Sequence, residues 1–404
     1  MPRRQRLGVA LAAAIAVAGC GGGAAGTAES VPADAKPTTS APYAAAYGGG
    51  PGSLELTSEE AAIVARLEGE GPLGCAIEER LVRAARRHAA VLASADRSQG
   101  EAEIDHLRFA VLAEGGTEYQ LAPFATRDLE AGLQDLVAFV AEHRRDVTHC
   151  GVGKASAGGR DVVVWVGAKR AVSFAPIPVS SDVGTALTVS GAVAGAAGAV
   201  RAYLGLPDGS AIALNARVSD GALTVEVPLE RRGRYDLEIQ IDLGGGPETA
   251  SLLPLFAGMP PDERPTIAAA GMEDGGASPE APDALIVSLV NAARKRLGLA
   301  PLARDARLDG LAAAHCADMV ALGYFGHRSP SGAMLAERLR TSGLNPSAFG
   351  ENVARSSSAS RVHRNLMTSP SHRIELLSRS YTHLGVGVAR DGDDLVVTEV
   401  LVRW

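Results

Sequence analysis

The chain has 404 residues, more than one hydrophobic core usually organises, so its length predicts two or three folded domains joined by linkers. Hydrophobic residues make up 46% and charged residues 21% of the sequence, a balance typical of globular domains, and 47 glycines indicate flexible joins. The formal net charge of −7 argues against nucleic acid as a partner, because such sites need clustered Lys and Arg.

The N-terminus has the pattern of a secretory signal. Three arginines within the first six residues precede an apolar run from Leu7 to Ala18, which is too short for the roughly 20 residues of a membrane-spanning helix. The run ends on Val17-Ala18-Gly19-Cys20, which resembles the bacterial lipobox, where the cysteine takes a diacylglycerol and becomes the mature N-terminus. We therefore expect residues 1–19 to be a signal peptide and Cys20 to be lipidated.

Residues 20–53 are predicted to be a disordered tether. They are mostly Gly, Ala, Ser, Thr and Pro, with too few large apolar residues for a core. Stable lipid anchoring takes two or more acyl chains. We expect the protein to lie in the cell envelope, outside the cytoplasm, with the membrane as a partner through this anchor.

Residues 54–177 repeat the pattern of the last third of the chain. The segment Thr148–Gly153 matches Thr382–Gly387 at an offset of 234, and a strand of similar pattern follows each. Two similar ends in the same order predict two similar folds, so we interpret residues 54–177 as a diverged copy of the C-terminal domain. Three earlier residues match at an offset of 227: Arg80, Leu81 and His88 correspond to Arg307, Leu308 and His315.

Residues 178–258 have the pattern of a small antiparallel β-sandwich. Short alternating apolar runs are separated by Gly, Pro and Asp. Gly233-Arg234-Tyr235, before the last run, resembles the turn ahead of a late strand in immunoglobulin-like domains, which usually space or dock their neighbours. Residues 259–282, rich in Pro, Gly and acidic residues, are predicted to be a linker.

Residues 283–404 begin with helices and end with strands. Apolar residues recur at helical spacing over 283–297, and the next helix places His315 on the same face as Leu308 and Met319. Residues 384–388 and 395–397 are predicted to be two strands around a turn. The expected class is therefore α+β.

Six segments of this last third carry a family resemblance. They are Val290–Arg294 with Gly298–Leu302, Ala314–Met319, Gly323–His327, Phe349–Val353, Leu366–Arg373 and Leu384–Val388. In this order they resemble the CAP family (cysteine-rich secretory, antigen 5, pathogenesis-related), also called SCP-like. The resemblance implies a three-layer α-β-α sandwich over residues 283–404, with a cleft lined by His and acidic residues.

Carried over by position, the resemblance places His327, Glu351 and His372 in the cleft. Two neutral imidazoles and a carboxylate could hold a divalent metal such as zinc, through His327 and His372, or pass protons near neutral pH. The family's animal and plant members have a second cleft Glu, which has no counterpart here, since Ser369 and Pro370 occupy the nearest stretch. This departure argues against a complete metal site.

The N-terminal copy lacks these side chains. Aligning the two copies sets Pro123 opposite Glu351 and Phe124 opposite Asn352, and no Ser-Pro-x-His run precedes Thr148. We therefore predict that residues 54–177 are a degenerate CAP-like domain without a cleft site. An alternative interpretation of Glu351 and Asn352 is a turn that caps a helix.

The remaining histidines and Arg373 have structural interpretations. We expect His315 to be a core residue whose ring bonds a backbone carbonyl, and His363 to face solvent on a helix. His149 and His383 share one place in the two copies, which indicates packing at the start of a strand. Arg373 is expected to position its neighbours by hydrogen bonds.

Three cysteines remain once Cys20 is assigned to the lipid. Cys75 and Cys150 lie near the two ends of one repeat, so we expect them to form a disulfide in an oxidising compartment. Cys316 would then stay free beside the apolar face of its helix.

Two classes of function follow. The first is a non-catalytic binding module of the envelope, whose cleft or sandwich holds a small apolar ligand, a polysaccharide or an envelope protein. The second is a metal-assisted or Ser/His hydrolase of envelope peptide or glycan, with Ser329 or Ser371 activated by His327 or His372. The sequence has no Gly-x-Ser-x-Gly elbow and no His-Glu-x-x-His helix, which favours binding.

Overall fold

The computed structural model describes residues 43–49, 55–94, 102–119, 121–127, 129–143, 147–194, 198–242, 246–261 and 281–404. The predicted signal peptide, Cys20, most of the tether and most of the 259–282 linker lie outside these ranges. The chain divides into two compact units, one ending at Ser180 and the other containing Ser181–Met259 and the C-terminal residues. No helix of the described ranges is long and apolar enough to cross a membrane.

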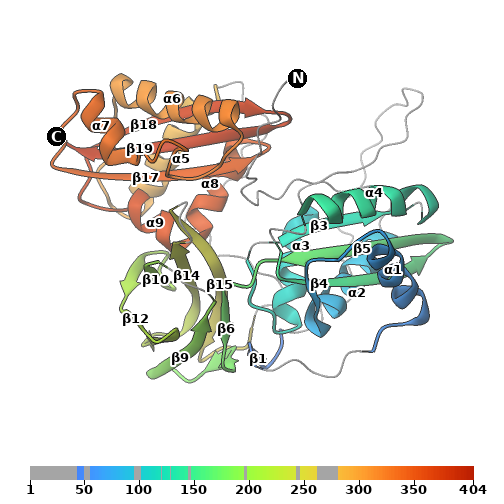
Figure 1. Ribbon diagram of the computed structural model, residues 1–404. Helices are drawn as coiled ribbons and strands as arrows, with labels where there is room; N and C mark the ends of the chain where they lie inside the picture. Colours follow the sequence, from blue (N-terminus) through green and yellow to red (C-terminus); the bar gives the residue numbers. More distant parts are fainter. Residues whose placement is uncertain are drawn as a thin grey trace, which may run out of the picture. The chain divides into compact units, whose positions relative to one another are not determined.

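The N-terminal unit combines helices with a mixed sheet (Figure 1). Its sheet has the order β2-β4-β5-β3, in which β2 is parallel to β4 and the other pairs are antiparallel. The helices are α1 (Ser58–Gly69), α2 (Glu79–Ser94), α3 (Ala102–Ala113) and α4 (Leu129–His143). The strands are β2 (Ala76–Ile77), β3 (Leu121–Thr126), β4 (His149–Ala157) and β5 (Arg160–Ala168), with β1 (Ala46–Tyr47) paired to β7 (Ile177–Pro178) and a short β6 (Val172–Phe174).

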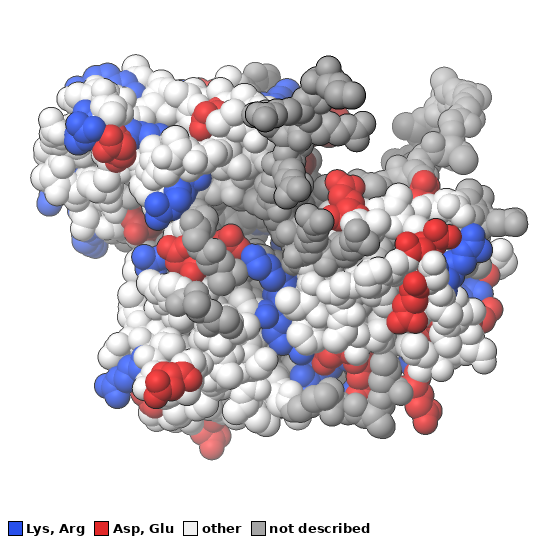
Figure 2. All heavy atoms as spheres, in the orientation of Figure 1, with Lys and Arg blue, Asp and Glu red and all other residues white. Residues whose placement is uncertain are grey.

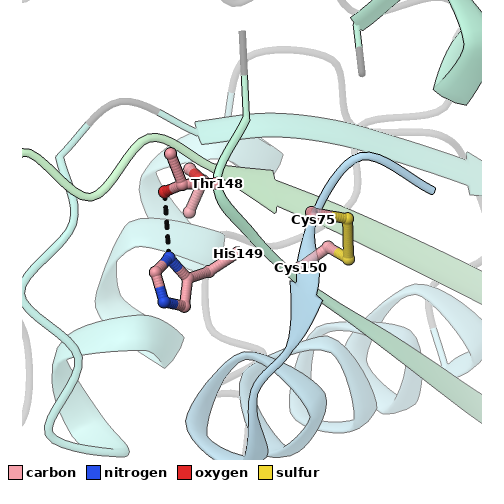
Figure 3. Close-up of a disulfide and its surroundings, with 5 residues drawn as sticks. Cys75, Thr148, His149 and Cys150 are labelled. Carbon is pink, nitrogen blue, oxygen red and sulfur yellow. Dashed lines mark hydrogen bonds between the residues drawn. A yellow bond between two sulfur atoms is a disulfide. The ribbon is translucent and has the colours of Figure 1, made fainter. Parts of the chain in front are cut away.

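Helix α2 packs closely on β4 because two glycines leave room for it. A β-carbon on Gly151 or Gly153 would collide with the α2 backbone at Val82 or Arg86. The same unit contains the disulfide Cys75–Cys150, which ties the residue before β2 to β4 (Figure 3). Beside it, Thr148 Oγ1 lies 2.9 Å from His149 Nδ1.

The second unit begins with the β-sandwich. Along β13 the apolar residues Leu223, Val225 and Val227 are buried and alternate with more exposed ones, as expected for a sheet with one solvated face. β11, β10, β14 and β15 lie in that order in one sheet, and β12, β13 and β9 in the other. The strands are β8 (Ser180–Ser181), β9 (Thr185–Val193), β10 (Val200–Gly205), β11 (Ala211–Leu214), β12 (Ala216–Ser219), β13 (Ala222–Leu229), β14 (Gly233–Asp242) and β15 (Pro247–Ala257).

The C-terminal domain is a three-layer sandwich around a sheet of order β16-β18-β19-β17 (Figure 1). Helix α6 packs on one face through Leu308, Cys316 and Met319, whereas α5 and α8 pack on the other. The helices are α5 (Pro282–Arg296), α6 (Ala306–Leu322), α7 (Leu335–Thr341), α8 (Ala359–Thr368) and α9 (Pro370–Leu376). The strands are β16 (Ala303–Arg304), β17 (Ala348–Ser356), β18 (His383–Asp391) and β19 (Asp394–Arg403).

The two mixed sheets share one topology. In each, a two-residue strand is parallel to the first long strand, which pairs antiparallel with the next, which in turn pairs antiparallel with the edge strand. Gly385 and Gly387 leave room for α6 to pack closely on β18. Gly151 and Gly153 do the same for α2 on β4. The mixed α and β content agrees with the predicted α+β class. Figure 2 shows basic and acidic side chains interspersed over the face in view.

Candidate functional site

The three residues predicted to line a cleft come from three elements of the C-terminal domain. Helix α6 ends at Leu322, and its C-cap Gly323, with a φ of 64°, turns the chain into the loop that carries His327. Glu351 lies on the edge strand β17, opposite Val400 of β19, and His372 lies on α9. Glu351 and its neighbour Asn352 are therefore in a strand, and the alternative of a helix-capping turn is wrong.

The buried carboxylate of Glu351 is held on both oxygens. His327 Nδ1 donates to Oε1 at 3.0 Å, and Arg338 of α7 donates to Oε2. Arg338 also donates to the His327 carbonyl at 3.0 Å, so the three residues form one closed cluster. Burial alone would raise the pKa of Glu351, but the His327 hydrogen bond and the charge of Arg338 outweigh it and lower the pKa. Glu351 is therefore ionised, and both of its carboxylate oxygens accept a hydrogen bond.

His372 has a partner of its own. Its Nδ1 lies 2.7 Å from Ser369 Oγ, and among the described residues no hydrogen bond joins it to His327 or Glu351. Burial lowers the pKa of His372 to about 4; the charge of Glu238 acts against this shift and His327 adds to it. The His372 ring is thus neutral at physiological pH. It interacts with His327 through charge and not through a hydrogen bond.

A second acid reaches this region from the β-sandwich. Glu238 of β14 accepts hydrogen bonds from Ser369 Oγ at 2.8 Å, from the Ser371 backbone nitrogen at 2.8 Å and from Ser371 Oγ at 3.0 Å. Gln240 of the same strand donates to Ser371 Oγ at 2.7 Å. The sequence analysis missed Glu238, because an acid within an alternating strand is normally assigned to the solvated face.

A buried polar pair lies next to the cleft. Asn352 Nδ2 donates to Glu399 Oε2 at 3.0 Å and approaches the His372 carbonyl at 3.4 Å. Burial raises the pKa of Glu399 to about 7, although the Asn352 hydrogen bond opposes the shift. Sequence reasoning also missed this residue, which stands inside a run of apolar strand residues.

Residues 287–402 match the family model described as the Cysteine-rich secretory protein family, CAP. These residues are a CAP domain. The uncharacterized protein YkwD of Bacillus subtilis (strain 168) is 34% identical over 108 residues, 26% of this chain and 42% of that protein. The uncharacterized membrane protein YlbC of the same organism is 36% identical over 106 residues, 26% of this chain and 31% of that protein. The chain therefore spans less than half the length of either curated relative.

Solved structures with CAP or SCP domains also resemble the chain. One is an extracellular protein containing a SCP domain from Bacillus anthracis str. Ames, 19% identical, with a TM-score of 0.29 over 58% of this chain and 86% of that one. Another is a cysteine-rich secretory protein from Staphylococcus aureus subsp. aureus Mu50, 13% identical, with a TM-score of 0.26 over 58% of this chain and 81% of that one.

The other histidines of the CAP domain have mixed outcomes. His315 is buried on α6 and its Nε2 donates to the Gly326 carbonyl at 3.0 Å, so it has the core role expected and steadies the loop before His327. The expectation for His363 is wrong, because α8 buries that ring against the domain, and burial lowers its pKa to about 4. His383, at the start of β18, lies with Nδ1 2.9 Å from Thr382 Oγ1, as His149 does from Thr148.

The prediction for Arg373 is wrong, and the prediction for Cys316 is confirmed. Arg373 is buried, and its Nε and Nη2 have no hydrogen-bond partner among the described residues, so it does not position neighbours as expected. Its place is set by packing against β10 at Gly205, where a β-carbon would collide with the guanidinium. Cys316 is free and buried, and its thiol contacts Thr398 Oγ1 at 3.2 Å.

The residues predicted to line the cleft do not fit the hypothesis of a zinc site. In the part of the chain that the structure describes, no group of three or more His, Cys, Asp or Glu side chains is arranged to hold a metal ion. Both oxygens of Glu351 are taken by His327 and Arg338, and the guanidinium charge opposes a cation at this carboxylate. This set of residues therefore does not suit a bound divalent cation.

The proposed serine nucleophiles do not meet an imidazole. Ser329 Oγ lies 2.7 Å from Ser331 Oγ and accepts from the Ala333 nitrogen at 3.0 Å. Ser371 Oγ donates to Glu238. The serine beside a cleft histidine is instead Ser369, which is buried.

Proposed function

We propose that the protein is an exported, lipid-anchored CAP-domain protein of the cell envelope whose cleft binds a ligand and does not hydrolyse one. The proposal of export and anchoring rests on the charged flank, the short apolar run and the cysteine at position 20. The candidate ligands are a small apolar molecule, a polysaccharide or an envelope protein.

The observation that carries the binding proposal is the closed His327–Glu351–Arg338 cluster. A serine hydrolase needs an accessible hydroxyl bonded to a histidine whose other nitrogen is oriented by an acid. Here the acid is bonded to His327 and neutralised by Arg338, and no serine hydroxyl contacts that ring in the described residues. Such a cluster suits recognition, because its polar groups are rigidly placed without a nucleophile.

One observation favours the alternative of a Ser/His hydrolase. Ser369 Oγ lies 2.7 Å from His372 Nδ1, which is within the range of a nucleophile and its base. Ser369 is nevertheless buried and donates its hydroxyl hydrogen to Glu238, which opposes its use as a nucleophile. We therefore rank this alternative second.

The test compares binding and turnover on purified peptidoglycan sacculi with the full-length protein in detergent. Arg338→Ala opens the cluster, so we expect it to reduce co-sedimentation with sacculi, whereas the control Arg340→Ala, an exposed residue of the same helix, leaves it unchanged. The sacculi should release no soluble fragments. Release of fragments that is lost in Ser369→Ala would establish the hydrolase instead. Equal co-sedimentation of all three proteins would contradict a glycan-binding cleft.

We also propose that residues 54–177 are a degenerate CAP-like copy. Pro123 pairs with Val166 as Glu351 pairs with Val400, and the shift from Val166 to Val400 (400 − 166 = 234) is the offset of the strand match. The shared sheet topology supports the same interpretation. At the next register position Phe124 and Trp165 replace the polar pair Asn352 and Glu399, so this copy would lack the cleft chemistry.

We propose that the sandwich is immunoglobulin-like. Tyr235 Oη donates to the Arg231 carbonyl at 3.0 Å and accepts from the Arg231 nitrogen at 2.8 Å. A tyrosine that bonds back to the backbone a few residues upstream, at the start of a late strand, is a feature of that fold. The domain would then serve to dock a neighbour, as such sandwiches usually do.

A further inference from the structure

The outward face of β14 is unusually polar and unusually buried. Asp236, Glu238 and Gln240 alternate with the core residues Leu237 and Ile239, so their side chains leave the sandwich core. This face of a two-layer sandwich is normally solvated. Here all three polar residues are buried, and Glu238 is 0% exposed.

The CAP domain covers this face with helix α9. Glu238 gathers the hydroxyls of Ser369 and Ser371 and the Ser371 nitrogen on its two oxygens. Thr249 of β15 donates to Oε1 at 2.6 Å from the sandwich side. The carboxylate is therefore fixed by donors from both domains, and a buried charge of this kind is stable only when it is so fully hydrogen-bonded.

Two further contacts join the sandwich to the CAP domain. Arg373 fills the space over Gly205 of β10, and the charges of Asp236 and Glu238 act on its guanidinium. Gly246, just before β15, stands beside His327, since a β-carbon there would lie 3.5 Å from His327 Cβ. The sandwich thus contacts both segments of the CAP domain that carry a predicted cleft histidine, at His327 itself and at Arg373 next to His372.

The hydrogen bond from Ser369 to Glu238 determines which nitrogen of His372 carries the proton. Ser369 donates its single hydroxyl hydrogen to Glu238 Oε2. Ser369 Oγ also lies 3.0 Å from Ser371 Oγ, but Ser371 donates its own hydroxyl hydrogen to Glu238 Oε1. The Ser369 oxygen must then accept from His372 Nδ1, at 2.7 Å. The imidazole consequently carries its proton on Nδ1, and Nε2, which has no hydrogen-bond partner among the described residues, presents a lone pair.

We infer that Glu238 of the sandwich is a positioning residue of the CAP cleft: through Ser369 it sets the tautomer of His372, so that the cleft offers Nε2 as a hydrogen-bond acceptor. The ligand recognised there must present a hydrogen-bond donor, such as a hydroxyl or an amide N–H. The assignment of Nε2 as a ligand contact rests on the proposed binding function. The ligand site is accordingly shared by two domains.

The test reads the tautomer directly, by ¹⁵N NMR of the full-length protein labelled at histidine, in detergent at pH 7. The His372 signals are assigned by their loss in His372→Gln. In the wild type we expect a protonated Nδ1 and a bare Nε2. In Glu238→Ala the Ser369 hydroxyl is free to donate to His372 Nδ1, so the ring proton should move to Nε2. The ¹⁵N chemical shifts of Nδ1 and Nε2 should then change places.

Ser369→Ala is the second variant, and it removes the link without touching the sandwich. It should also end the preference for protonated Nδ1. Glu226→Ala is the matched control, an exposed acid of β13 that bonds Thr188 within the sandwich, and it should leave the His372 shifts unchanged. A wild-type ring protonated on Nε2, or a Glu238→Ala ring that stays protonated on Nδ1, overturns the inference.

The two proposals fail separately. The tautomer is measured without ligand, so a null result there leaves the sacculus-binding comparison of Arg338→Ala intact. Conversely, if sacculi do not bind but the tautomer follows Glu238, the positioning role stands and the proposed ligand is wrong.

Discussion

At the residue scale, the CAP domain contains two buried acids in opposite situations. Glu351 is paired with His327 and Arg338, which lower its pKa. Glu399 receives one hydrogen bond, from Asn352, its Oε1 has no partner among the described residues, and burial raises its pKa to about 7. The difference follows from the neighbouring charges, because burial disfavours the ionised form of both.

Glu399 should therefore cost the domain stability as the pH rises. Its folded-state pKa of about 7 lies above the ordinary 4.5, so the folded state holds the proton more tightly, and stability present below pH 4.5 is lost as the pH rises through 7. We expect Glu399→Gln to match the wild type near pH 4.5 and to be more stable at pH 8 by about 1 to 3 kcal/mol. Urea titrations at the two pH values measure this.

The matched control is Glu337→Gln, since Glu337 is an exposed acid of α7 paired with Arg340. Its stability should follow the wild type at pH 8. If Glu399→Gln is less stable than the wild type at pH 8, the buried carboxylate is held by partners other than Asn352, and the explanation is wrong.

At the element scale, glycines decide how closely a helix approaches its sheet. On β18 a β-carbon at Gly387 would fall on the α6 backbone at Ala313, and on β4 one at Gly153 would fall on the α2 backbone. In each of the two mixed-sheet domains the helix lies against the first long strand only because the side chain is absent. This explains the Gly-Val-Gly pattern that the two segments share.

Gly387→Ala should consequently destabilise the CAP domain. Backbone atoms cannot rotate away as side chains do, so the strand or the helix must shift, and overpacking of this kind costs about 1 to 3 kcal/mol. The control is Gly310→Ala in the same helix α6, where a β-carbon meets nothing within 4 Å and should add about 0.5 to 1 kcal/mol of stability. Chemical denaturation of the two variants tests the pair, and a Gly387→Ala protein as stable as Gly310→Ala would refute the close approach.

At the scale of the whole molecule, the disulfide and the anchor belong to the extracytoplasmic setting that we propose. Cys75 and Cys150 close a loop with a sequence separation of 75, which stabilises the N-terminal unit by about 4 to 5 kcal/mol in the chain-entropy treatment. Cys316 is buried and free. Cys20 lies outside the described residues, and its role is a prediction from the signal pattern alone.

Replacing that cysteine tests the anchor. In Cys20→Ala the acceptor thiol is gone, so incorporation of radiolabelled palmitate should stop and the protein should leave the membrane fraction, because no acyl chain remains to insert. Cys316→Ala, which removes a buried thiol, should label as the wild type does. Undiminished labelling of Cys20→Ala would show that position 20 is not the lipid site.

The sequence by itself was enough for the CAP domain, the α+β class, the core role of His315 and the choice of Cys75 and Cys150 as partners. Each of these predictions depends on residue types at fixed spacing along the chain, and folding does not change that spacing. Tertiary structure alone decided that His363 is buried, that Arg338 neutralises Glu351, that the cleft residues do not form a metal set, and that Glu238 reaches Ser369. Each of these depends on which surfaces are pressed together. Glu238 and Ser369 are 131 residues apart, and no periodicity within either segment specifies the other.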